Sequence, residues 1–224
     1  SIQSFEGGYD KNFSYLLTCL QTMNSVIIDA SIKPNALKPF QKSNPIAILI
    51  THSHSDHIKY VNDFRKCYPN IKLIGHPESS LNKERNNFLS VNDNTIINIG
   101  NLEIKIIHTP GHYFDSVCFL VRDAVFTGDT MFIGRTGRTI SKGSDTKDLY
   151  NSVYKKLFKL PHNVMIYPGH NYGPKPSMTL LRILIQVACY AQKVKMILWL
   201  GWETMRKTGL KGLRIIWSIC KLVT

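Results

Sequence analysis

The segment THSHSDHI, at residues 51–58, places three histidines and an aspartate directly after the apolar run AILI at 47–50. A short apolar run of this kind is typical of a buried strand. In an extended chain, side chains two residues apart point to the same side, so several of these groups can share one face. The segment therefore predicts the start of a metal site, built from His52, His54, Asp56 and His57.

Short apolar runs alternate with polar stretches, and many strands with few helices between them predict a layered α/β or α+β domain. We expect helices at 58–67 and at 145–158, the second with Asp145 as a possible N-cap. The sequence NIGNL, at 98–102, predicts a hairpin turn. The expected strands lie within 13–20, 25–30, 47–50, 71–75, 95–100, 102–109, 116–121, 124–128 and 163–169.

The length of 224 residues allows one sizeable core and requires no second full domain. The five cysteines are an odd number without close spacing, which argues against a disulfide framework and favours a reducing compartment. The first ten residues lack a secretory pattern, so we expect a cytoplasmic or organellar-matrix protein. The chain starts with Ser1, which is compatible with a truncated N-terminus.

Three further motifs follow strand-like runs: TPGH at 109–112, TGD at 127–129 and YPGH at 167–170. Each contains a glycine turn, where a short loop can aim its side chain at a point above the strand edges. The motifs add His112, Asp129 and His170 to the set.

The seven groups exceed what one tetrahedral ion can use. Neutral imidazole and carboxylate suit zinc, iron or manganese, and no cysteine lies at ligand spacing. Two ions held in this way would share and deprotonate a water molecule. Asp29 could brace the loop, although a simple turn role is an equal alternative. The predicted division is His52, His54 and His112 for a first ion, Asp56, His57 and His170 for a second, and Asp129 between them.

The four motifs, in this order, resemble those of the metallo-β-lactamase superfamily over roughly residues 5–176. The resemblance implies an α+β fold, an αββα sandwich of two packed mixed sheets flanked by helices, with metals at the strand edges. It also implies an enzyme, and two branches compete. One is glyoxalase II, the hydroxyacylglutathione hydrolase, and the other comprises the persulfide dioxygenases, which oxidise glutathione persulfide with one iron.

The stretches 128–139, 149–161 and 165–173 resemble the dioxygenase branch more closely. A hydrolase of the glyoxalase II type would also carry a long C-terminal helical domain, for which this chain is short. We therefore expect persulfide oxygenation on Fe(II) first, and thioester hydrolysis with one or two Zn, Fe or Mn ions as the alternative. The dioxygenase resemblance implies a triad, and the catalytic set that we expect is His52, His112, Asp129 and Asp56.

The resemblance implies a small glutathione derivative as substrate. Arg138 matches a basic position near the glutathione moiety, and its planar fork suits a carboxylate, with a solvated loop arginine as the alternative. Tyr172, close to His170, lines the same pocket or packs in the core. The chain departs from the family pattern at the predicted substrate wall, at Lys59, Tyr60, Tyr113, Ile140 and Ser141.

The net charge of +13 is concentrated near the C-terminus, where residues 181–224 hold eight Lys and Arg against one Glu. Residues 1–180 carry the remaining net charge of +6, and no stripe of basic and aromatic residues runs through them. This argues against a nucleic-acid-processing enzyme. Polar residues interrupt 181–224 too often for a membrane span, so membrane contact is expected only if this basic segment is native. Besides a metalloenzyme and a nucleic-acid-processing enzyme, a third interpretation is a damaged protein that keeps the ligands but is not catalytic.

We expect a metallo-β-lactamase-like catalytic domain at 1–180 and an anomalous basic tail at 181–224. The tail contains all three tryptophans, Trp199, Trp202 and Trp217, and family resemblance is lost within a few residues of its start. We predict that it arises from a reading-frame change just after PKPSMTL, and that it packs poorly and exposes its tryptophans.

Resequencing the coding DNA tests the origin of the tail. We expect a frame change near codon 181, which would restore a charged, amphipathic helix in place of the basic segment. An uninterrupted frame through Thr224, with a matching intact mass and a tail that resists protease, would show instead that the tail is native.

Overall fold

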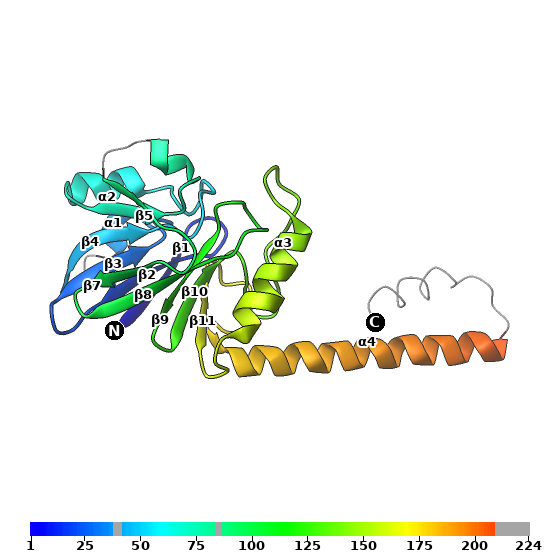
Figure 1. Cartoon of the computed structure of the whole chain (residues 1–224). Coiled ribbons are helices and arrows are strands. Elements are labelled where there is room, and N and C mark those ends of the chain that lie inside the picture. Colours follow the sequence, from blue (N-terminus) through cyan, green and yellow to red (C-terminus); the bar gives the residue numbers. More distant parts are fainter. Residues whose placement is uncertain (38–41, 84–86, 209–224) are drawn as a thin grey trace. The chain divides into compact units, whose positions relative to one another are not determined.

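Two six-stranded sheets make up most of the first of two units in the chain. The computed structural model describes residues 1–37, 42–83 and 87–208, and divides the chain into Ser1–Leu181 and Arg182–Thr224. Figure 1 shows the first unit, with most of its strands and helices labelled.

The first sheet has the strand order β1-β2-β3-β4-β5-β6. Its first three strands pair antiparallel, and the pairs from β3 to β6 are parallel. The strand bounds are β1 Ile2–Gly7, β2 Asn12–Thr18, β3 Asn24–Ile28, β4 Asn44–Leu49, β5 Lys72–Gly75 and β6 Phe88–Ser90.

The second sheet has the order β12-β11-β10-β9-β8-β7, in which only β10 and β11 pair in parallel. The predicted hairpin turn is confirmed, because Ile99 of β7 pairs with Leu102 of β8 across a loop that contains Gly100 at a φ of 57°. The strand bounds are β7 Ile96–Ile99, β8 Leu102–His108, β9 Val117–Val121, β10 Ala124–Gly128, β11 Met165–Pro168 and β12 Met178–Thr179.

The core lies between the two sheets and is built by strand alternation. Phe13, Tyr15 and Leu17 of β2 enter one cluster with Phe119 and Phe126 of the second sheet. A fully buried aliphatic or aromatic side chain of this size stabilises the fold by about 1.5–3 kcal/mol. The inter-sheet cluster therefore holds the two sheets together and fixes the relative position of their edges.

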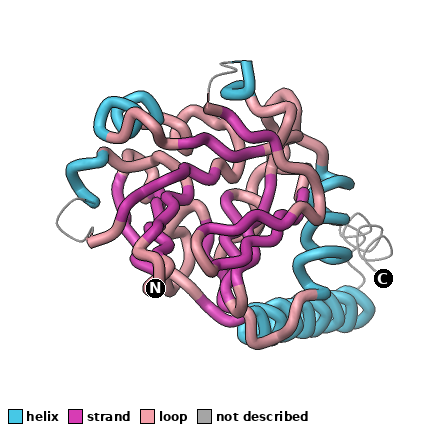
Figure 2. Tube along the Cα trace, turned by 60° about the vertical axis from the view of Figure 1, so that its left-hand side comes forward, coloured by secondary structure: helices cyan, strands magenta, loops and turns pink. Residues whose placement is uncertain are grey.

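Helices cover the outer faces of both sheets, as Figures 1 and 2 show. Helices α1 (Pro34–Leu37) and α2 (Val61–Cys67) pack on the first sheet through a second cluster that includes Leu37, Phe64 and Ile48. Helix α3 (Thr146–Tyr150) lies beside β10 and β11 and buries Leu149. The predicted αββα sandwich is confirmed.

The helix boundaries differ from those expected. Helix α2 begins at Val61 and not at residue 58, because the preceding turn bonds elsewhere: Ala30 N–H donates to His57 O and Tyr60 N–H to Ala30 O. The second helix is capped by Asp145 as predicted, with Asp148 N–H donating to Asp145 Oδ1 at 2.8 Å. It continues as a π-helix, η3 (Asn151–Lys156), and a 3-10 turn, η4 (Leu157–Lys159), and a further 3-10 turn is η2 (Ser80–Lys83).

Helix α4 (Leu180–Thr208) contains the described part of the second unit. Trp199 is 60% exposed, whereas the side chain of Trp202 and all of Trp217 lie outside the described residues. No helix in the described ranges has the length and apolar character needed to cross a membrane. The proposed frame change stays a prediction.

Candidate metal centre

The candidate residues lie where strand ends of both sheets meet. The histidine segment follows β4 of the first sheet, and the other three motifs follow or end β8, β10 and β11 of the second. Backbone bonds join the two sheets at this edge: Val117 N–H donates to Thr51 O at 2.7 Å, and Phe13 N–H to Gly169 O at 2.8 Å. The fold therefore holds four separate motifs over one point.

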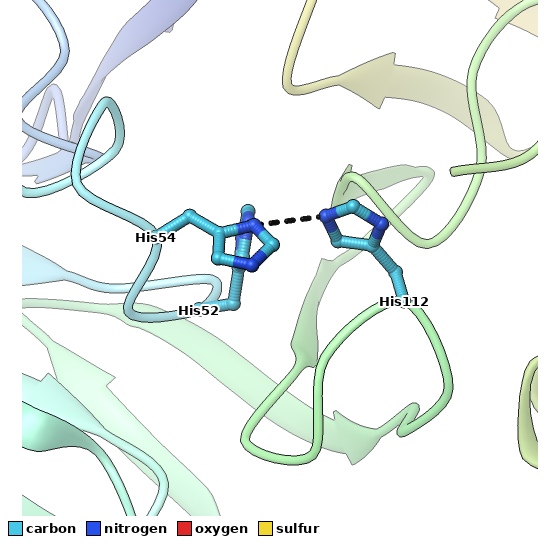
Figure 3. A group of neighbouring side chains, drawn as sticks. All are labelled: His52, His54 and His112. Atoms are coloured by element: carbon cyan, nitrogen blue, oxygen red, sulfur yellow. Dashed lines mark hydrogen bonds between the residues drawn. The ribbon is translucent and has the colours of Figure 1, made fainter. Parts of the chain in front are cut away.

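The first half of the cluster consists of three histidines whose rings converge (Figure 3). His54 Nδ1 lies 3.0 Å from His52 Nε2 and 3.0 Å from His112 Nε2. If His54 is protonated on Nδ1, this N–H can point at only one of the two Nε2 atoms; if it is protonated on Nε2, the Nδ1 lone pair faces both of them. These three residues form one of the groups whose ligand atoms lie close enough to hold an ion.

The second half contains two histidines and one carboxylate. His57 Nε2 and His170 Nε2 are 3.2 Å apart. Asp56 Oδ2 lies 3.5 Å from the first of these nitrogens and 3.4 Å from the second. This half forms another group that could hold an ion.

Asp129 lies between the two halves. Its Oδ2 is 3.5 Å from His112 Nε2 of the first half and 3.3 Å from His170 Nε2 of the second. Its Oδ1 is 3.2 Å from His57 Nε2, yet it is buried and has no hydrogen-bond donor among the described residues. A buried carboxylate oxygen without a donor is costly unless a cation compensates it.

Hydrogen bonds from outside the cluster fix which ring nitrogens face inward. The Nδ1–H of His57 donates to Asp29 Oδ2 at 2.7 Å, that of His170 to Asp10 O at 2.8 Å, and that of His112 to Arg138 O at 2.8 Å. The tautomers follow from these acceptors. In the neutral rings, each Nε2 therefore presents a lone pair to the centre.

The spacing of these inward atoms fits metal ligation. Two nitrogens bound to zinc at about 2.0–2.1 Å with tetrahedral angles lie roughly 3.3–3.4 Å apart. The observed separations of 3.0 and 3.2 Å are close to this value. Facing lone pairs repel at such distances, and a cation between them converts the repulsion into binding.

Burial opposes protonation in the first half. It lowers the pKa of His52 well below the ordinary histidine value, and the nearby His57 lowers it further. Burial and then His112 lower the pKa of His54 to about 4. These rings are therefore neutral near pH 7, which is the form that ligates a metal.

Carboxylates dominate the second half. Burial alone would lower the pKa of His57 and His170, but Asp129 with Asp29 raises the first well above its usual value, and Asp129 with Asp56 raises the second to about 9. Burial would raise the pKa of Asp56 and of Asp129, but the neighbouring histidines lower both. The negative carboxylates of the second half therefore stabilise a positive charge placed among its ligand atoms.

Asp29 braces two parts of the cluster at once. Of its two predicted roles, bracing and a simple turn, the structure supports bracing. Besides His57, its carboxylate accepts from Thr51 N–H at 2.8 Å and from Thr51 Oγ1–H at 2.7 Å. The oxygen of that hydroxyl lies 3.1 Å from His52 Nδ1 and can accept a hydrogen bond from its N–H. One buried carboxylate thus orients a histidine in each half of the cluster.

A cavity of about 740 Å³ opens beside the cluster. Arg138 and Tyr172, both predicted from the sequence, line it together with Arg135 and Asp10. The Arg135 guanidinium lies 4.2 Å from the centre of the Tyr172 ring, and the Tyr172 hydroxyl donates to the Asp10 carboxylate. Burial and the Asp10 hydrogen bond raise the pKa of Tyr172 above its ordinary range.

The structure brings all seven predicted ligand residues together and leaves other histidines outside. His76 instead stacks on His108, with ring centroids 4.3 Å apart. Sequence reasoning missed Asp10, Asn12 and Arg135. Asp10 and Asn12 reach the cluster only through the β1–β2 hairpin, and no motif in the sequence marks that approach.

Comparisons with known proteins agree with this arrangement. The family model described as Metallo-beta-lactamase superfamily matches residues 7–170. A hydroxyacylglutathione hydrolase of Francisella tularensis subsp. novicida is 35% identical over 167 residues, which cover 72% of this chain and 64% of that protein. The chain thus spans less than two thirds of that relative's length.

Two further comparisons extend the set. A probable polyketide biosynthesis zinc-dependent hydrolase, BaeB, of Bacillus velezensis is 28% identical, with 77% of this chain and 79% of that protein covered. The crystal structure of ETHE1 from Myxococcus xanthus has a TM-score of 0.73 and 25% identity, and the match covers 81% of this chain and 80% of that one.

Gly169→Ala should lower the metal content of the purified protein. A Cβ at this position would lie 2.4 Å from Asp129 Oδ1 and 2.8 Å from His57 Cε1, so both side chains would have to move. Metal per chain is measured by elemental analysis, with Gly75→Ala as the control because its Cβ would meet no atom closer than 3.4 Å. Equal metal content in the two variants would contradict the close approach.

Proposed function

Because the chain belongs to the metallo-β-lactamase superfamily, we propose that it is a metal-dependent hydrolase of glutathione thioesters. The observation that carries the proposal is the complete bracing of the second half of the cluster. His57, His170 and Asp56 each hydrogen-bond to a group outside the cluster: Asp29, Asp10 O and Asn12 respectively. Bracing of this kind orients metal ligands and supports a second ion.

The seven cluster residues would hold the metal, with Asp129 shared by both halves. Two bound ions at such a site lower the pKa of a water molecule and polarise a carbonyl group. Zinc suits the nitrogen and oxygen donors, and one relative is a probable zinc-dependent hydrolase. The protein's own part is to keep His52 and His54 neutral, the carboxylates ionised and the braced ligands in a fixed orientation.

The cavity supports an anionic thiol-linked substrate. Arg138 and Arg135 are exposed on its wall, and a guanidinium fork binds carboxylates well. Glutathione carries two carboxylates, and the relative with 35% identity is a hydroxyacylglutathione hydrolase. We assign Arg138 to a substrate carboxylate, and Tyr172 to the wall next to the second half.

Persulfide oxygenation is the second candidate, and it is supported by the motif pattern of the sequence. The stretch 128–139 resembles the dioxygenase branch, and the likeness to the solved ETHE1 structure covers most of the chain. In this reaction one Fe(II) would be held by His52, His112 and Asp129, and it would supply the oxygen chemistry. The second half would then carry no catalytic ion.

His170→Ala separates the two reactions. For a two-metal hydrolase, we expect metal content to fall from about two ions to about one, with thioester turnover reduced by about 100-fold or more because the pair no longer acts together. His162→Ala, an exposed histidine outside the cluster, is the control. One iron per wild-type chain, oxygen uptake with glutathione persulfide and no thioester cleavage would establish the second candidate instead.

Arg138→Ala should weaken substrate binding without slowing the chemical step. A carboxylate contact at an exposed site is worth about 1–2 kcal/mol, so KM should rise roughly 5- to 30-fold at a nearly unchanged kcat. Lys142→Ala is the matched control, because it removes an exposed positive charge from the same loop without lining the cavity. A large fall in kcat at constant KM would assign Arg138 to the reaction itself.

A further inference from the structure

The hairpin between β1 and β2 wraps the second half of the cluster. Its backbone accepts the Nδ1–H of His170 at Asp10 O, at 2.8 Å, and Asn171 N–H at Lys11 O, at 2.9 Å. The Asn12 side chain donates Nδ2–H to Asp56 Oδ2 at 2.8 Å. Two of the three ligand side chains in this half are therefore oriented by the hairpin.

The first half is held differently. The outward nitrogens of His52 and His112 face Thr51 Oγ1 and Arg138 O, which lie in the loops that follow β4 and β10. Within the described parts of the chain, no hydrogen bond joins the hairpin to a ring of the first half. The hairpin thus acts on one metal position and leaves the other alone.

Among the residues that the structure describes, Asn12 makes the one side-chain hydrogen bond from the hairpin to a ligand atom. It is 1% exposed, and the oxygen that it contacts, Asp56 Oδ2, also lies 3.5 Å from His57 Nε2 and 3.4 Å from His170 Nε2. The hydrogen bond occupies one lone pair of this oxygen and stops the carboxylate from rotating. The other lone pair then points at the centre of the second half.

We propose that Asn12 is a positioning residue that builds the second metal position through Asp56. This inference rests on the two-ion cluster of the proposed function, but its test measures metal binding and not the reaction. Loss of a hydrogen-bond partner of a metal ligand typically weakens metal binding 10- to 100-fold. The loss should be confined to one of two ions, because the first half makes no comparable contact.

Zinc titration of the full chain against a chromophoric chelator tests the proposal. The wild-type chain should bind two zinc ions in two steps. Asn12→Ala should lower the affinity of the second, weaker step by about 10- to 100-fold and leave the first step unchanged. The fold should tolerate this change, because Asn12 Oδ1 has no hydrogen-bond partner among the described residues and its removal leaves no donor unpaired. A thermal melt of each variant checks this expectation.

Asn171→Ala is the matched control. It also removes an asparagine amide next to the cluster, but its Nδ2–H donates to Glu6 Oε2 and not to a ligand, so both zinc affinities should remain. Unchanged zinc affinities in Asn12→Ala, an equal loss at both steps, or a single zinc ion in the wild type would each overturn the proposal.

The failure of this inference and that of the proposed function are distinguishable. Thioester cleavage by a two-zinc wild type with an indifferent Asn12→Ala would reject Asn12 and keep the function. A selective loss of the second zinc in Asn12→Ala, with no thioester cleavage by the wild type, would keep Asn12 and reject the reaction.

Discussion

Repulsion among inward-facing histidine nitrogens is the constraint on which the rest of the site depends. Three nitrogen pairs lie 3.0, 3.0 and 3.2 Å apart, and most of the nitrogens involved are buried. Neutral imidazoles at this distance repel, and burial makes protonation of His52 and His54 unfavourable. A cation at the centre is the arrangement that satisfies both the lone pairs and the Asp129 carboxylate.

The surrounding fold maintains this unfavourable geometry by fixing four of the histidine rings from behind. Asp29 binds His57 and, through Thr51, also orients His52, while backbone oxygens of Asp10 and Arg138 hold His170 and His112. These acceptors lie in the loops that connect the strands, and the inter-sheet core holds those strands together. The packing energy of the sandwich thus keeps the ligands preorganised, so that binding a metal requires little rearrangement.

Local sequence pattern predicted which seven residues the fold brings together, because each of them follows a strand end directly or lies on a short glycine turn. Two features of this pattern are local: the alternation of side chains in the segment after β4, and the turns at His112, Asp129 and His170. Together they were also sufficient to predict the fold class. The hairpin residues Asp10 and Asn12 could not be found in this way, because their contacts join positions that are 160 and 44 residues apart in sequence. The predicted start of α2 was wrong for the same reason, because Tyr60 N–H donates to Ala30 O, an acceptor that is distant in the sequence.

An anomalous-difference map from crystals grown with zinc, collected at the zinc absorption edge, tests the central claim most directly. The account predicts two peaks inside the cluster, one among His52, His54 and His112, one among Asp56, His57 and His170, with Asp129 between them. A single peak bound by His52, His112 and Asp129, with the second half empty at saturating zinc, would contradict it.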